Sequence, residues 1–72
     1  MTTQRVTRII RDAEFVAVGV CEDGAIRLIC KGARAVTFPK AHALHADALA
    51  LVEIEDTEVF ESAVMGWIYP KV

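Results

Sequence analysis

The chain has 72 residues and a mass of 7.9 kDa, which is enough for one domain over residues 1–72. Hydrophobic residues make up 54% of it and charged residues 25%, which excludes an intrinsically disordered or low-complexity chain. The longest apolar run, residues 15–21, is far shorter than the ~20 residues of a membrane span, and no signal-peptide pattern follows the N-terminal arginines. We expect a cytoplasmic globular domain with residues 1–4 disordered.

Residues 5–11 alternate weakly between apolar and polar side chains, which predicts a strand. Asp23-Gly24 then lies between two β-rich segments, and this dipeptide is typical of a hairpin with a two-residue type I′ turn. Such a turn would pair Cys21 with Ile26. The predicted core face of the hairpin then consists of Phe15, Ala17, Gly19, Cys21, Ile26, Leu28 and Cys30.

The opposite face of this predicted hairpin is half apolar, which is unusual for a sheet surface left in water. Either a helix of the same chain or a second molecule is expected to cover it. We predict that the face binds a partner, together with Trp67 and Tyr69, whose side chains are of the types enriched at binding hot spots. The predicted partner-binding residues are Val16, Val18, Val20, Arg27, Ile29, Trp67 and Tyr69.

The second half of the chain gives mixed signals. Residues 33–38 predict a strand that Pro39 ends, and the alanine-rich residues 40–52 predict a helix, although a strand from Leu49 competes with its end. Asp56 or Thr57 is placed to cap a last helix, and the spacing of the apolar residues after it suits a helix. Their β-branched and aromatic character favours a final strand over residues 65–69 instead, which we prefer.

These elements predict an α+β fold. It would consist of a small, mainly antiparallel sheet of four or five strands, with a β-hairpin at residues 15–31 and one helix after Pro39.

Candidate catalytic and metal-binding residues are few. His42 and His45 could share one helix face, but no third ligand accompanies them, so we interpret them as surface imidazoles and predict no metal and no cofactor. Cys21 and Cys30 fit reduced cytosolic thiols. No phosphate-binding glycine motif or catalytic triad is evident, so we predict neither an enzyme nor a small-molecule site. A domain this small is marginally stable alone, and we expect a homodimer or a complex with a larger protein.

Charge is unevenly distributed, since residues 1–40 are net positive and residues 41–72 are net negative. Arginines recur at every third position from Arg5 to Arg11, as a phosphate-contacting arm would require. The pI near 5.5 and the lack of interleaved aromatic residues favour a protein partner over nucleic acid. The residues of this alternative nucleic-acid surface are Arg5, Arg8, Arg11, Lys31 and Arg34.

Residues 31–55 offer one local resemblance. The sequence Lys-Gly-Ala-Arg-Ala-Val-Thr-Phe-Pro-Lys at residues 31–40, followed by Val-Glu-Ile-Glu at residues 52–55, resembles the AbrB/VapB-type swapped-hairpin antitoxins and transition-state regulators. The resemblance implies a dimer formed by hairpin exchange that grips operator DNA. It also implies that Lys31 and Arg34 contact phosphate and that Lys40 starts a helix.

From the residues as a whole we expect a small non-enzymatic regulatory or inhibitory protein, bacterial or phage-encoded, that occludes a surface of a larger target. The alternative is a dimeric AbrB/VapB-like DNA-binding transcription regulator or antitoxin. Dependence of binding on salt distinguishes them, because phosphate contacts weaken steeply as salt rises.

Overall fold

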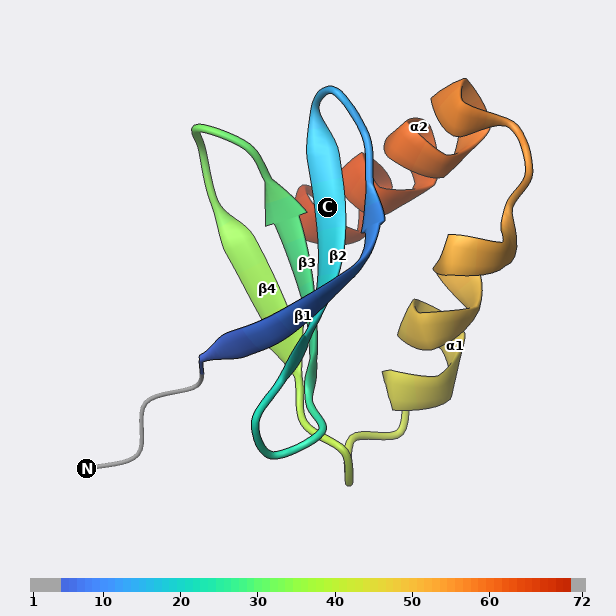
Figure 1. Cartoon of the computed structure of the whole chain (residues 1–72). Coiled ribbons are helices and arrows are strands. Elements are labelled where there is room, and N and C mark those ends of the chain that lie inside the picture. The colour runs from blue at the N-terminus through green and yellow to red at the C-terminus, as the bar shows by residue number, and fades with distance from the viewer. Residues whose placement is uncertain (1–4, 71–72) are drawn as a thin grey trace.

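The computed structural model describes residues 5–70 as a four-stranded antiparallel meander followed by two α-helices (Figure 1). In the sheet, β1 (Val6–Asp12), β2 (Val16–Cys21), β3 (Ile26–Cys30) and β4 (Ala35–Phe38) lie side by side in chain order. Helix α1 (His45–Ala50) continues into the 3-10 helix η1 (Leu51–Glu53), and α2 (Thr57–Ile68) follows. The α+β class is confirmed; the disorder expected for residues 1–4 lies outside the described residues.

The β2–β3 hairpin is present, but its turn differs from the predicted one. Cys21 N–H donates to the Ala25 carbonyl over 2.8 Å, so the loop has three residues, 22–24. Gly24 has a φ of 89°, and no described non-glycine residue has a positive φ, which is incompatible with a type I′ turn at Asp23. The Asp23 carboxylate instead accepts a hydrogen bond from Ala25 N–H at 3.1 Å. The strands therefore pair with Val20, and not Cys21, opposite Ile26.

This one-residue shift exchanges the faces of β2, because side chains alternate along a strand. Val16, Val18 and Val20 join Ile26 and Leu28 on the face that forms the core. The predicted core face was wrong for four residues: Ala17, Gly19 and Cys21 lie on the opposite face, and Phe15 is 53% exposed before β2. The observed register gathers the larger apolar side chains on one face, where burial stabilises the fold most.

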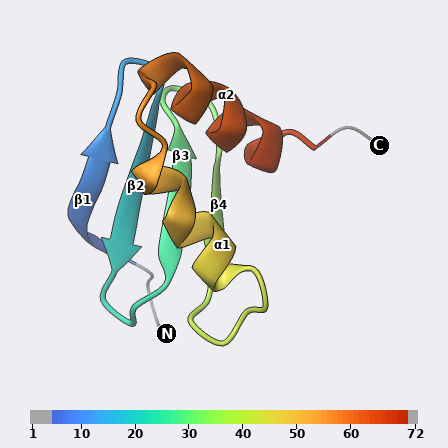
Figure 2. The ribbon, with the colours of Figure 1, turned by 90° about the vertical axis from the view of Figure 1, so that its right-hand side faces the viewer.

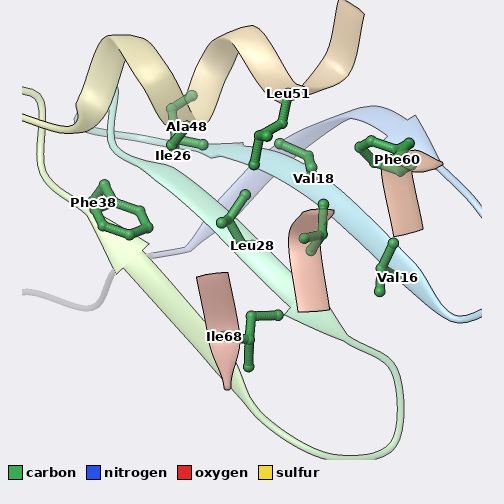
Figure 3. Close-up of a cluster of buried hydrophobic side chains, with 10 residues drawn as sticks. Val16, Val18, Ile26, Leu28, Phe38, Ala48, Leu51, Phe60 and Ile68 are labelled. Atoms are coloured by element: carbon green, nitrogen blue, oxygen red, sulfur yellow. The ribbon is translucent and has the colours of Figure 1, made fainter. Parts of the chain in front are cut away.

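Both helices pack against this core face (Figure 2). α2 replaces the final strand favoured over residues 65–69, so the chain has two helices after Pro39 and not one. Asp56 caps α2 as predicted, accepting a hydrogen bond from Val59 N–H at 3.1 Å. Phe60, Val64 and Ile68 follow at helical spacing and are at most 1% exposed, which outweighs their strand propensity. They meet sheet residues such as Leu28 in the cluster of Figure 3.

The helix predicted over residues 40–52 is shorter than expected. α1 begins only at His45, and residues 40–44 form turns, so Lys40 does not start the helix. η1 occupies the place of the competing strand that would have begun at Leu49, and that alternative was wrong. Ala48 and Leu51 are the buried residues of this segment.

The helices leave the other face of the sheet uncovered; we call it the open face. Strand β1 crosses obliquely over its neighbours in Figure 1 and pairs with β2 through two register shifts. A Cβ atom built on Gly19 would lie 2.6 Å from Val6 Cγ1 and 3.3 Å from Ile9 Cδ1. The side chains of β1 thus lie directly over Gly19. On the same face, Ala17 and Cys21 are 4% and 2% exposed without any helix above them.

Candidate binding surface

Three of the seven predicted partner-binding residues lie in the core of the chain itself. Val16 and Val18 are fully buried under the helices, and Val20 packs against the same core. A helix of the same chain or a second molecule was expected to cover these valines, and helices of the same chain do so. These three valines are therefore corrected from binding residues to core residues.

The remaining predicted partner-binding residues lie elsewhere. Arg27 and Ile29 are on the open face, paired with Gly19 and Ala17 of β2, and both are half-buried. Trp67 is half-buried and packs edge-on against Phe38, with ring centroids 5.3 Å apart. Tyr69 follows α2 and is 45% exposed.

Arg11, a predicted nucleic-acid residue, has an internal structural role. Its Nη1 atom donates to the carbonyl of Val52 at 2.8 Å and to that of Ile54, and Nη2 donates to the carbonyl of Glu55 at 3.4 Å. The guanidinium carbon lies 4.2 Å from the ring centroid of Phe60. Arg11 thereby ties β1 to η1 and to the residues between η1 and α2, and its donors are used within the chain.

Two further basic candidates also have partners within the molecule. Lys31 Nζ lies 2.6 Å from a carboxylate oxygen of Asp12 and donates to the carbonyl of Ala13 at 2.6 Å. The Arg34 guanidinium lies 5.4 Å from the ring centroid of Tyr69. Arg5, just before β1, and Arg8, within it, are exposed. The five predicted nucleic-acid residues therefore do not form one uniform basic strip.

The histidines hold loops together. His45 Nε2 lies 3.0 Å from the carbonyl of Gly24 in the β2–β3 turn. His42 Nδ1 accepts a hydrogen bond from Leu44 N–H at 3.0 Å, and its ring packs edge-on against Phe38 at 5.3 Å. Within residues 5–70 no three His, Cys, Asp or Glu residues gather in a way that could hold a metal ion.

The two cysteines are free thiols on opposite faces of the sheet, and not on one face as predicted. Burial raises the pKa of the Cys21 thiol; the charge of Arg27 opposes this shift, and that of Asp23 adds to it. Cys21 is therefore held in its protonated form, which is a weak nucleophile. Cys30 is half-buried and packs against the core.

Opposite charges gather in the two layers of the molecule. Residues 5–40, which contain the sheet, carry seven Lys or Arg and four Asp or Glu. Residues 41–70, which contain the helices, carry six Asp or Glu and no Lys or Arg. Figure 2 shows these two parts as separate layers, so the uneven charge distribution along the sequence makes the sheet layer net basic and the helical layer net acidic.

The open face is the candidate binding surface. Strand pairing brings together on it side chains from β1, β3 and β4, and Ile9 is 48% exposed among them. The β1 contribution was not predicted, because strict alternation places Val6 and Ile9 on opposite faces. The register shift between Val6 and Arg8 brings both to the open face. The surface consists of Val6, Ile9, Asp12, Arg27, Ile29, Ala35 and Thr37.

The described part of the chain has no pocket, and neither of its helices is long and apolar enough to cross a membrane. Comparison with protein-family models, with curated proteins and with solved structures finds no match to this chain.

Proposed function

We propose that this protein is a small non-enzymatic binding module that lays its open face on a larger protein and occludes the surface beneath. One observation carries the proposal. Among residues 5–70, the sheet face that the helices leave uncovered bears Ile9, which is 48% exposed, beside Val6 of the same strand, and Arg27 and Ile29 on β3. An apolar patch with an arginine within it has the composition of a protein-binding surface.

Charge favours an acidic surface on the target. The open face belongs to the basic layer and carries Arg27, and Arg5 is exposed just before β1. Asp12, the acidic residue on this face, is paired with Lys31. An acidic surface with an apolar centre complements this arrangement and accelerates encounter between the partners. Stacking the open face on that of a second copy would instead bring Arg27 near Arg27, and like charges disfavour such a contact.

The exposed Arg5 and Arg8 also support the alternative, a DNA-binding regulator. The two functions differ in what the apolar residues do. A phosphate-binding arm depends on its arginines and loses affinity steeply between ~50 and ~200 mM salt. A protein-binding face depends on burying Ile9 and its neighbours, and that contribution persists at higher salt.

The test compares two matched variants in affinity capture from nuclease-treated bacterial lysate. Ile9→Ser removes an apolar side chain from the open face, and Val59→Ser removes one of similar exposure, 54%, from α2. We expect the wild type and Val59→Ser to capture one acidic protein at 200 mM salt. With Ile9→Ser, the amount of this protein captured should fall at least tenfold. Equal capture by both variants, or retention of nucleic acid alone in an untreated lysate, would overturn the proposal.

A further inference from the structure

The outer edge of β4 presents unpaired main-chain groups. Cys30 N–H donates to the carbonyl of Arg34 over 2.8 Å, which fixes the alternation of hydrogen bonds along the β3–β4 ladder. Val36 and Phe38 therefore direct their main-chain groups toward β3. Ala35 and Thr37 direct their N–H and C=O groups away from the sheet, and no described strand lies beyond β4. These groups are ready to pair with another strand.

The two edges of the sheet differ in how they are protected. β1 is interrupted by two register shifts and is tied by Arg11 to the segment after η1, and both features hinder an added strand. β4 has no register shift and no charged residue over residues 35–38. Natural edges without such protection are templates for strand pairing. The edge open to a partner strand is thus that of β4.

We propose that β4 pairs antiparallel with β4 of a second copy around a two-fold axis centred on Val36. In this register Ala35 of each copy exchanges hydrogen bonds with Thr37 of the other, so the outward groups of one strand match those of its twin. Val36 meets Val36 in the closely spaced, non-hydrogen-bonded position. Arg34 lies opposite Phe38, which places a cation beside a ring instead of a second cation.

The surroundings of β4 supply further surface for this contact. Trp67 packs on Phe38, and Tyr69 lies against Arg34, so the end of α2 carries two aromatic side chains beside the edge strand. Tryptophan, tyrosine and arginine are the residue types that dominate binding energy at interfaces. The pairing would also join two sheets into one, with both open faces on the same side. The β4 pairing does not depend on the proposed function, because its contacts do not include Ile9.

Disulfide trapping tests the register. In the proposed dimer the Cα atoms at position 36 are ~4.5 Å apart, within the range that a disulfide spans. We expect Val36→Cys, in a Cys30→Ala background, to form a covalent dimer under mild oxidation at least tenfold faster than the control Ser62→Cys, which is exposed on α2. Equal rates for the two variants would overturn the proposal.

Sedimentation equilibrium provides a second measurement. The wild type is expected to be a dimer at ~100 μM, and Thr37→Pro, which removes an outward N–H donor that β3 does not use, is expected to be a monomer with unchanged circular dichroism. A monomeric wild type at this concentration would refute the pairing. If that monomer still captures a target protein and Ile9→Ser weakens the capture, the proposed function is unaffected. If Ile9→Ser does not weaken capture although the trapped dimer forms, only the proposed function is refuted.

Discussion

The two sides of strand β2 reach similar burial by different means. On the covered face, large side chains such as Val18 and Leu28 pack against Phe60 and Ile68 of α2. On the open face, Ala17, Gly19 and Cys21 of β2 are small, and side chains of β1 lie over Gly19. The helices thus cover one side of β2, and β1 of the same sheet lies over part of the other. Large buried side chains stabilise the covered face, whereas the packing of β1 on β2 requires small residues in β2.

The largest expected loss of stability comes from a substitution in the core beneath the covered face. Phe60→Ala removes the largest fully buried side chain of the core, and both lost burial and the cavity left behind destabilise the fold by ~3–5 kcal/mol. Phe15→Ala is the matched control, because Phe15 is 53% exposed; its cost should stay within ~0.5 kcal/mol. Urea denaturation followed by circular dichroism measures both. A cost below ~1.5 kcal/mol for Phe60→Ala would contradict the packing described for α2.

A smaller change in stability is expected from a substitution at Gly19, on the open face. Gly19→Ala adds a methyl group 2.6 Å from Val6 Cγ1 and 3.3 Å from the Arg8 carbonyl oxygen, so β1 must move, at a cost of ~1–3 kcal/mol. Gly66→Ala makes the same chemical change in α2 with nothing within 4 Å of the new atom. It should stabilise the protein by ~0.5–1 kcal/mol. Opposite signs in thermal unfolding are expected; the same sign for both would show that β1 does not press on Gly19.

The smallest effect concerns the thiol on the open face. Burial raises the pKa of Cys21 in the folded state, so folding favours the protonated thiol. This contribution is complete below the ordinary cysteine pKa of ~8.5 and is lost as pH rises through the higher folded pKa. The free energy of unfolding should therefore fall more between pH 8 and 10 in the wild type than in Cys21→Ala. Identical pH profiles for the two proteins would contradict the burial of this thiol.

The strands and the fold class were accessible from the sequence, whereas the faces of β2 were not. Asp23-Gly24 signals a hairpin, but two-residue and three-residue loops both accept glycine with a positive φ. Which loop forms is decided by the register that buries Val16, Val18 and Leu28 together, a property of the whole sheet. A local turn signal therefore located the hairpin and misassigned its core.

The same limit applies to α2 and to the arginines. Phe60, Val64 and Ile68 favour strands individually, and only the core that they share with the sheet selects the helix. Arg11 resembles the exposed Arg5 and Arg8 in sequence. Its role as a donor to the carbonyls of Val52 and Ile54 depends on segments more than forty residues away. The basic spacing was visible, but the internal partners that remove Arg11 from any binding surface were not.

The order of the elements has a consequence for synthesis. Every strand of the meander precedes both helices, so the sheet is synthesised and emerges from the ribosome before the residues that cover it. Until Phe60 and Ile68 emerge, the valines of β2 have no partner layer, and the nascent chain exposes a sheet face fit for aggregation. That interval lasts until residues 45–68, which form the covering layer, have also emerged.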